Sequence, residues 1–346
     1  MNKLLLIGSG TVHTYNYYRL IEGSFDRIRL ITDRIIPGNE DINTVMGNFE
    51  IRNPINICRN IQSIRKQIRK FRPDLIHVQQ ANSIAWLSIR ANKPFGIPLI
   101  VTAWGSDILD LPNRNLILRN MVAYSLRKAD ALTADAHIVE EKINALSPGL
   151  EKPLLIANFG IDPFYRPMKK ENVIYSNRLH RKLYRIDEII RAFNRFRKDQ
   201  DIEWKLIVAG DDAETESLKK LVAALKLNGH VDFVGWVDKD NNNLFYNRSR
   251  IYVSIPSTDA TAISLLEAMH AGCIPVVADI PVSHEWIQDD VNGIIVKSME
   301  ENFIQRALAM DPEKVMTINQ DIIKKRGLKH SNREKFINLY NQMLGT

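Results

Sequence analysis

Two acidic residues in the second half of the chain, Asp259 and Glu267, stand among small and apolar neighbours. Seven residues separate them, so Glu267 lies about two helical turns beyond Asp259, in a helix that opens near Ser264. Ionised carboxylates only accept hydrogen bonds, which suits ligands rich in hydroxyl groups such as sugars and riboses. The free N–H groups and positive dipole end of such a helix would form an anion pocket without a metal. A helix cap followed by a solvated Glu267 is the simpler alternative.

A second candidate loop lies near the start of the chain, where Gly8-Ser9-Gly10-Thr11 follows a short apolar run. Glycines allow a bound group to approach the backbone closely. A dinucleotide-binding fingerprint requires a further glycine at position 13, which is histidine here, and Asp33 alone does not restore the match. A tight turn between a strand and a helix explains this loop equally well.

The elements that position these residues alternate regularly. Short runs rich in Ile, Leu and Val, interspersed with helical patterns, indicate buried parallel strands in two doubly wound sheets, an α/β architecture. The expected strands are 4–7, 28–32, 75–78, 99–101, 173–176, 204–209, 231–234, 251–255 and 274–277. The link at 156–170 contains proline and glycine without a sustained period. We therefore expect domains at 1–165 and 166–330, followed by a helix at 331–346.

That last helix shows its own start signal. Ser331 with Glu334 has the spacing of a capping box, and an apolar stripe follows on one face. The stripe consists of Phe336, Leu339, Tyr340 and Met343. We expect this stripe to pack back against the first domain, since it has to be buried somewhere.

Composition limits the function further. The chain has 346 residues, a net charge of +7 and only two cysteines, Cys58 and Cys273, which do not form a pair of metal-ligand spacing. Zinc and iron–sulfur sites are therefore not expected, and a reducing compartment is. No apolar run reaches the roughly 18 to 20 residues that cross a bilayer, so we expect a cytoplasmic protein. The positive charge suits an anionic partner such as a nucleotide phosphate.

The stretch from Ser254 to Asp279 resembles the acidic motif of GT-B glycosyltransferases, specifically retaining family 4, or group 1. That family usually has glutamate at both acidic positions, and here the first is Asp259. Further matches support the resemblance across nearly the whole chain. They are Gly272-Cys-Ile-Pro-Val-Val, Glu285-Trp-Ile, Asn292-Gly293, Pro73-Asp-Leu-Ile-His77 and the run from Gly96 to Asp107.

The resemblance implies two Rossmann-like domains facing across a cleft, a nucleotide-sugar donor bound by the second domain, and no cofactor or metal. Arg178 and Lys182 would grip the donor diphosphate, with Arg181 and Arg185 as substitutes for Lys182. Solvated charges flanking a helix are the alternative for these cations. With Asp259 and Glu267, Arg178 and Lys182 form the expected catalytic set. The expected donor-binding residues are Gly10, Trp236, Val237, Thr261, Ala262, Ile263, Ser264 and Glu267.

On the acceptor side the sequence departs from the family, because Trp104 stands where histidine often precedes Gly-Ser-Asp. Related sequences with tryptophan there resemble this one in also carrying His-Thr near the start, here His13-Thr14. We therefore nominate His13 and Asp107 for the acceptor side. His77 is expected to be a hydrogen-bonded core residue at the end of a strand.

The segment 57–72 predicts a basic amphipathic helix. Its apolar face comprises Ile57, Ile61, Ile64, Ile68 and Phe71, and the other positions carry six basic residues and no acid. Such a helix fits an anionic membrane surface. The favoured alternative is a sheet-covering helix with a solvated basic face. Nucleic acid is not expected as a partner, since no aromatic interleaving accompanies the charge.

Together these features predict a retaining hexosyltransferase that moves a sugar from a UDP- or GDP-linked donor to a glycan or lipid-linked oligosaccharide. Cell-envelope polysaccharide synthesis at the inner face of the membrane is the expected setting. Two rivals stay open: a sugar-nucleotide epimerase of the same fold, and a non-catalytic nucleotide-sugar-binding subunit.

Overall fold

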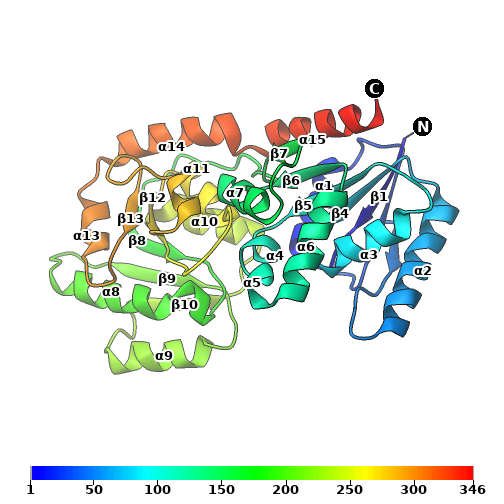
Figure 1. Cartoon of the computed structure of the whole chain (residues 1–346). Helices are drawn as coiled ribbons and strands as arrows, with labels where there is room; N and C mark the ends of the chain where they lie inside the picture. The colour runs from blue at the N-terminus through cyan, green and yellow to red at the C-terminus, as the bar shows by residue number, and fades with distance from the viewer. Residues whose placement is uncertain (1, 346) are drawn as a thin grey trace. The chain divides into compact units, whose positions relative to one another are not determined.

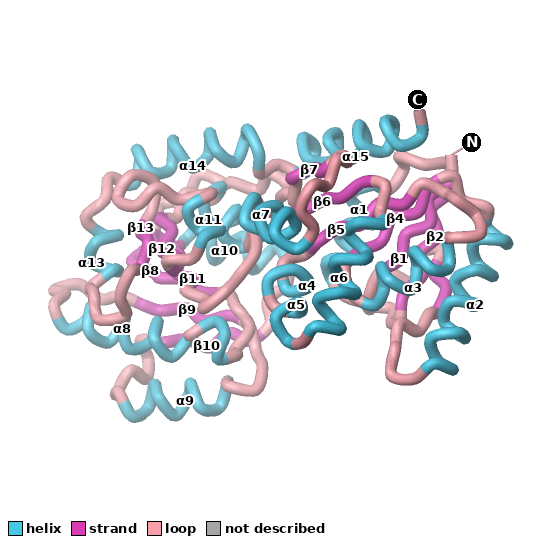
Figure 2. The backbone as a smooth tube through the Cα atoms, viewed as in Figure 1, coloured by secondary structure: helices cyan, strands magenta, loops and turns pink. Residues whose placement is uncertain are grey.

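The computed structural model describes residues 2–345. Strands and helices alternate along the chain (Figure 2), and the chain divides into two compact units. Unit 1 holds the chain up to Phe159 together with the segment from Lys329 onward, and unit 2 holds Gly160–Leu328. The first boundary thus falls a few residues before the end of the expected first domain. Ile161 lies in unit 2, where its N–H donates to the carbonyl of Gly327 at 2.9 Å.

The sheet of unit 1 has seven parallel strands in the order β3-β2-β1-β4-β5-β6-β7. Their bounds are β1 Lys3–Ile7, β2 Arg27–Thr32, β3 Thr44–Met46, β4 Leu75–Gln79, β5 Leu99–Ala103, β6 Ala131–Ala134 and β7 Leu154–Ile156. The four strands expected in this half are confirmed. The sequence did not reveal β3, β6 or β7, because two of them have only three residues and β6 reads Ala-Leu-Thr-Ala.

Helices cover this sheet (Figure 1). They are α1 Val12–Ile21, α2 Pro54–Phe71, α3 Ser83–Asn92, α4 Ser106–Leu109, α5 Leu111–Arg114, α6 Leu116–Lys128, α7 His137–Leu146 and α15 Lys329–Leu344. The capping box expected at Ser331 is wrong, because α15 already begins at Lys329 and Ser331 lies inside its first turn. The stripe is real: Phe336, Leu339 and Tyr340 are buried within unit 1.

Unit 2 contains six parallel strands in the order β10-β9-β8-β11-β12-β13. They are β8 Glu171–Ser176, β9 Lys205–Ala209, β10 Val231–Gly235, β11 Ser249–Ser254, β12 Ile274–Ala278 and β13 Ile294–Val296. The five strands expected here are confirmed, and β13 was not foreseen. The helical elements are a 3₁₀ turn, η1 Lys182–Tyr184, and α8 Ile186–Lys198, α9 Thr215–Ala224, α10 Lys239–Arg248, α11 Ile263–His270, α12 Pro281–His284, α13 Phe303–Leu308 and α14 Pro312–Arg326.

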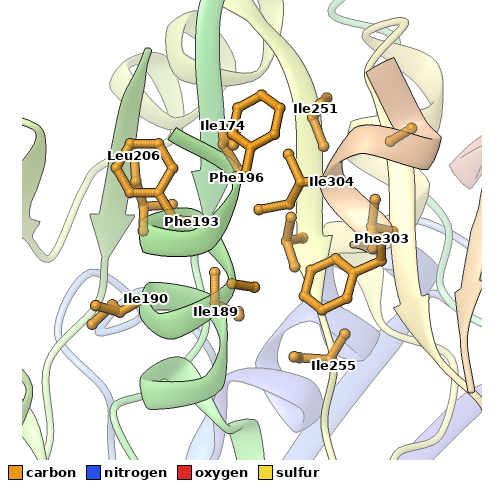
Figure 3. Packing of buried hydrophobic residues seen from close by; sticks show 14 of the residues in the cluster. Ile174, Ile189, Ile190, Phe193, Phe196, Leu206, Ile251, Ile255, Phe303 and Ile304 are labelled. Atoms are coloured by element: carbon orange, nitrogen blue, oxygen red, sulfur yellow. The ribbon is translucent and has the colours of Figure 1, made fainter. Parts of the chain in front are cut away.

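The largest core of unit 2 lies between its sheet and helices α8 and α13. Phe193 and Phe196 of α8 belong to this core together with Phe303 and Ile304 of α13, and all four are fully buried. Figure 3 shows the ring of Phe193 on the side of Leu206 and the ring of Phe303 toward Ile255. Burying a phenylalanine side chain stabilises a fold by about 1.5–3 kcal/mol. This packing fixes α8, whose start adjoins the turn after β8.

Both sheets follow the same plan. Numbered within its own unit, each sheet has the order 3-2-1-4-5-6, with a seventh strand added at the end in unit 1, so the direction of the strand order reverses between the first and fourth strands. Ligands of open parallel sheets bind beyond the carboxyl ends of the strands at such a switch point. The switch point lies between β1 and β4 in unit 1 and between β8 and β11 in unit 2. Within residues 2–345, no helix combines the length and apolar composition needed to cross a membrane.

Candidate functional site

The switch point of unit 2 brings together Arg178, which follows β8, and Asp259, which follows β11. Because β8 and β11 are hydrogen-bonded neighbours, their following loops meet although 81 residues separate the two side chains. An Arg178 guanidinium nitrogen lies 2.7 Å from Asp259 Oδ2, and another donates to Ser264 Oγ at 3.3 Å. Three predicted site residues thus form one cluster, here called the Arg178 cluster.

A glycine makes this position of Arg178 sterically feasible. Gly210, directly after β9, has φ +106°, a backbone conformation that side chains strongly disfavour. A Cβ atom at Gly210 would lie 2.7 Å from the carbonyl oxygen of Arg178. The turn that carries Arg178 therefore requires glycine at 210.

The electrostatics of the cluster are those of a desolvated ion pair. The side chains of Arg178 and Asp259 are 11% and 23% exposed. Burial lowers the pKa of Arg178, but the Asp259 carboxylate, Tyr252 and Tyr184 together outweigh burial, and the pKa lies above its usual value. Arg178 is thus a fixed cation whose present counterion is Asp259.

The second predicted cation lies elsewhere. The side chain stacked on Arg178 is Tyr184 of η1, with the guanidinium carbon 4.4 Å from the ring centroid. Arg181 pairs with Asp212 at 2.5 Å. Lys182 is exposed and lines, with Arg181 and Arg185, a cavity of about 460 Å³ at the starts of α8 and α9. Lys182 is not among the side chains that contact Arg178, and no sequence signal indicated the contact with Tyr184.

Helix α11 begins where the sequence predicts. Its N-cap, Ala262, has no side chain able to bond the first-turn amides, so those N–H groups are not capped by a side chain. Thr261, Ala262, Ile263 and Ser264 are all partly exposed, while Leu265, Leu266 and Met269 face the core as expected. The helix start can therefore present amides and a positive dipole end beside Arg178.

Glu267 lies one turn further along α11 in a much drier environment. Burial raises the pKa of its carboxyl to about 7, although hydrogen bonds from Tyr246 and Asn242 lower it. Asn242 Nδ2 donates to Glu267 Oε2 at 3.3 Å. Glu267 is therefore not the solvated helix residue of the simpler alternative.

The two residues after β10 differ in environment. The indole of Trp236 is 75% exposed, which leaves a face of the ring available for stacking. Val237 packs against a buried cluster that includes Tyr246 and Tyr252. Val237 thus helps to fix the loop that holds Trp236.

In unit 1, the glycine loop is tied to the protein itself. The Gly10 N–H donates to Asp33 Oδ1 at 2.6 Å, and Arg34 Nη2 donates to the Gly10 carbonyl at 2.9 Å. A Cβ atom at Gly10 would lie 2.4 Å from the Arg34 carbonyl oxygen. The close approach that requires this glycine is therefore to the loop after β2, and both backbone groups of Gly10 are already hydrogen-bonded.

The acceptor-side candidates differ in exposure. His13 is exposed in the first turn of α1, with its ring centroid 5.4 Å from that of Trp104. Asp107 is buried, and its carboxylate accepts the N–H groups of Ala81 at 2.6 Å and Trp104 at 3.0 Å. Burial raises the pKa of Asp107 to about 6, although these hydrogen bonds lower it. Its geometry suits holding the two loops in place.

His77 is the buried, hydrogen-bonded residue that the sequence indicates. Its Nε2 lies 2.7 Å from Thr102 Oγ1 and its Nδ1 lies 2.8 Å from the Tyr340 hydroxyl. Burial lowers the pKa of His77 to about 3, so the imidazole is neutral.

Helix α2 extends over the predicted basic segment. Ile64, Ile68 and Phe71 are buried against unit 1, as the core-packing alternative requires. The basic residues Arg59, Lys66, Arg69 and Lys70 are exposed on the remaining surface of the helix. The structure is therefore compatible both with a sheet-covering helix and with a helix that contacts an anionic membrane surface. Among residues 2–345, no group of three or more His, Cys, Asp or Glu side chains is arranged to hold a metal.

Comparisons with known proteins bear on both units. The family model described as glycosyl transferase 4-like matches residues 3–136, and the model for glycosyl transferases group 1 matches residues 162–310. Alpha-monoglucosyldiacylglycerol synthase of Streptococcus pneumoniae is 23% identical over 66% of this chain and 56% of its own length. N-acetyl-alpha-D-glucosaminyl L-malate synthase of Bacillus anthracis is 26% identical over 64% of this chain and 61% of its own length. The chain thus matches little more than half the length of these curated relatives.

Solved structures share the fold at low identity. HepE of Anabaena, crystallised with UDP, superimposes with a TM-score of 0.83 at 14% identity and covers 99% of this chain and 100% of its own. Sucrose-phosphate synthase of Thermosynechococcus elongatus gives 0.81 at 15% identity, with both chains covered completely. Two parallel sheets of this strand order define a GT-B protein. The family models that match the two units identify the family within this class. The chain belongs to the group 1 glycosyltransferases.

Proposed function

We propose that this protein is a retaining hexosyltransferase that transfers a sugar from a UDP- or GDP-linked donor to a hydroxyl group of a glycan or lipid-linked oligosaccharide. The observation that carries the proposal is the Arg178 cluster, a fixed cation beside an acidic side chain and the open start of α11. A cation, exposed amides and a carboxylate are the groups that a diphosphate joined to a polyhydroxylated sugar needs.

In the proposed reaction, the bond between the anomeric carbon and the diphosphate oxygen breaks, and a bond to the acceptor oxygen forms on the same face. The acceptor proton passes to the departing diphosphate. Arg178 and the amides at the start of α11 stabilise the negative charge that grows on the leaving group, which is differential stabilisation of the transition state. Asp259 and Glu267 accept hydrogen bonds from donor hydroxyls, and no metal takes part.

Donor binding requires Asp259 to exchange partners. In the structure its carboxylate neutralises Arg178 at 2.7 Å. A diphosphate carries more negative charge than a carboxylate, so it replaces Asp259 as the partner of Arg178. Asp259 is then free to accept hydrogen bonds from the attached sugar. Lys182 supplies a second cation from the adjoining cavity at the start of α8, and Trp236 stacks on the nucleobase.

On the acceptor side, His13 is the residue proposed to contact the acceptor, since its ring is exposed beside Trp104. Asp107 acts by holding the loops of Ala81 and Trp104 through its two backbone hydrogen bonds. The exposed basic residues of α2 are proposed to contact an anionic membrane surface, at about 1 kcal/mol for each residue near the surface.

The relatives support a UDP-linked donor and an envelope acceptor. HepE was crystallised with UDP and with UDP-glucose, and the Streptococcus pneumoniae relative is named for a glucosyl diacylglycerol product. We therefore place the protein in cell-envelope glycan synthesis, at the inner face of the membrane.

Radiolabelled UDP- and GDP-hexoses, incubated with the full chain and a lipid and glycan extract, test the proposal. Label in an alkali-stable acceptor product with retained anomeric configuration is the expected result. Isomerised sugar nucleotide without acceptor would instead identify an epimerase. Calorimetric binding without transfer to any extract would identify a non-catalytic subunit.

A further inference from the structure

A layer of polar side chains, in which the tyrosines are buried and the amides and Glu267 are partly buried, lies between α10, α11 and the sheet of unit 2. Asn242 of α10 is its branching point. The hydroxyl of Tyr175 donates to Asn242 Oδ1 at 2.6 Å, and Asn177 Nδ2 donates to the same oxygen at 3.0 Å. Two donors on that oxygen fix the orientation of the amide. The Asn242 amide nitrogen must therefore point the other way, where it donates to Glu267 at 3.3 Å.

The remaining members of the layer donate in the same direction. The Tyr252 hydroxyl donates to Asn177 Oδ1 at 3.1 Å, and Asn177 Nδ2 donates to the Tyr246 hydroxyl at 2.7 Å. Tyr246 in turn hydrogen-bonds the Glu267 carboxyl. The hydrogen bonds that begin at Tyr252 and Tyr175 therefore all end at the Glu267 carboxyl. An ionised carboxylate accepts hydrogen bonds without donating any, so it fits this end position.

We propose that Asn242 is a positioning residue that holds the Glu267 carboxylate ionised and oriented toward the donor's hydroxyl groups, with its amide locked by Tyr175 and Asn177. The role of Glu267 in donor binding rests on the proposed function, whereas the orientation and ionisation of Glu267 do not. Hydrogen bonds to a charged acceptor are stronger than neutral ones, so a locked donor has a measurable effect.

The hydrogen bonds of this layer oppose the effect of burial on the Glu267 carboxyl. Burial raises the pKa of Glu267 to about 7, and the hydrogen bonds from Tyr246 and Asn242 lower it. The other charged group that acts on Glu267 is Lys239 of α10, which also lowers its pKa. Tyr175 and Tyr252 approach from the sheet, and burial keeps both hydroxyls neutral by raising their pKa. Removing Asn242 should therefore raise the pKa of Glu267 further, because one of the hydrogen bonds that oppose burial is lost.

Further groups lie on the far side of Tyr246. Lys170 Nζ donates to the carbonyl of Tyr246 at 3.0 Å and approaches Cys273 Sγ at 3.9 Å. Burial raises the pKa of Cys273, so this thiol stays neutral through the range in which Glu267 titrates. His270, three residues along α11, has its pKa lowered by burial and accepts the N–H of Phe164 at 3.2 Å.

The full-length protein carrying ¹³C-labelled glutamate side chains allows a direct test by NMR titration. Glu267→Gln identifies the signal. Asn242→Leu keeps approximately the same volume but removes the donor, and we expect the midpoint of the Glu267 titration to rise by roughly one pH unit, as losing one hydrogen bond to a charged group implies. Tyr175→Phe removes one of the two locks, and we expect a smaller rise in the same direction.

Asn243→Leu is the matched control, since it introduces the same side chain at the next position of α10, outside the polar layer. We expect an unchanged titration. The inference is wrong if the Glu267 midpoint is the same in Asn242→Leu, Tyr175→Phe and Asn243→Leu. Because Tyr175→Phe is a mild change, it decides the question even where Asn242→Leu fails to fold.

Calorimetry with UDP-glucose between pH 6 and 9 adds a functional measurement. Asn242→Leu should bind several times more weakly at pH 7 and approach wild-type affinity at pH 9, where Glu267 is ionised in both proteins. Equal weakening at every pH would show that Asn242 only supports the fold. Absence of UDP-glucose binding by the wild type would count against the proposed donor, and the NMR titration would still decide the role of Asn242.

Discussion

The two switch points of this protein have the same topology and different contents. In unit 1, the loops after β1 and β4 bond to each other and to neighbouring loops, for example through Ser9 Oγ and Gln80 Oε1 at 3.0 Å. In unit 2, the loops after β8 and β11 meet through Arg178 and Asp259 at 2.7 Å. The two sheets share the strand order, but the side chains that follow the strands differ, and those of unit 2 form the ion pair whose carboxylate we propose a ligand replaces.

The buried polar clusters of the two units differ in the same way. His77 in unit 1 is bonded on both ring nitrogens, and its neutral form satisfies Tyr340 and Thr102. The layer in unit 2 ends instead on Glu267, a carboxyl whose pKa burial raises to about 7. A neutral, fully bonded group stabilises the fold. A carboxyl with a raised pKa, on the helix whose start lies beside Arg178, is a candidate group for binding.

The largest expected effect comes from removing the cation of the Arg178 cluster. Arg178→Ala should lower turnover by more than tenfold, and by ~10²–10³-fold if it equals the loss of one preorganised donor to developing charge. Glu267→Ala should also lose more than tenfold. Initial rates with saturating donor, alongside circular dichroism to confirm folding, measure both. Wild-type rates in the two purified variants would contradict the assignment.

Glu267→Gln should change how stability depends on pH. The folded-state pKa of Glu267, about 7, lies above the ordinary value of 4.5, so ionisation costs folded-state stability as pH rises from about 4.5 to 7. Glutamine avoids this cost. Denaturant titrations should show Glu267→Gln gaining up to about 3 kcal/mol relative to wild type between pH 4.5 and pH 8. A pH-independent difference would mean that Glu267 is not desolvated.

His77→Leu should reduce stability without affecting donor binding. It leaves the Thr102 and Tyr340 hydroxyls without their imidazole partner, at a cost of about 1–3 kcal/mol. Urea unfolding measures the stability, and calorimetry with UDP measures the binding by the folded fraction. Weaker UDP binding by folded His77→Leu would contradict the claim that the His77 cluster stabilises the fold without taking part in binding.

Asp259→Asn should have the smallest effect, and its direction depends on the ligand. Without the carboxylate, Arg178 is free for a diphosphate, and UDP alone should bind about two- to fivefold more tightly, the scale of a partly exposed ion pair. Transfer from the nucleotide sugar should fall, because the sugar loses an acceptor. A change in the same direction for both measurements would show that Asp259 is not an exchangeable counterion.

Much of this arrangement is predictable from sequence. Periodicity revealed nine of the thirteen strands, and the helix start at Ile263 followed from the loop before it. Arg178 and Asp259 were chosen by resemblance, and the strand order explains why they meet. Lys182 shows the limit: spacing after a strand does not determine which face of a 3₁₀ turn a side chain occupies, and Tyr184 is the one stacked on Arg178.

The polar layer could not be foreseen. Tyr175 and Tyr252 stand in apolar strands, where an aromatic side chain is indistinguishable from core packing until the position of its hydroxyl is known. Asn242 lies in a run of three asparagines, 241–243, whose partners come from other strands and helices. The start of α15 likewise depends on residues 329–330, which extend the helix beyond the capping box at Ser331.

Calorimetric titration of UDP and GDP into wild-type protein and Arg178→Ala tests the central claim most directly. We predict that at least one nucleotide diphosphate binds the wild type and that Arg178→Ala weakens this binding by tenfold or more. Equal affinity in the two proteins, or no binding of either nucleotide to the wild type, would contradict a diphosphate site at the β8–β11 switch point.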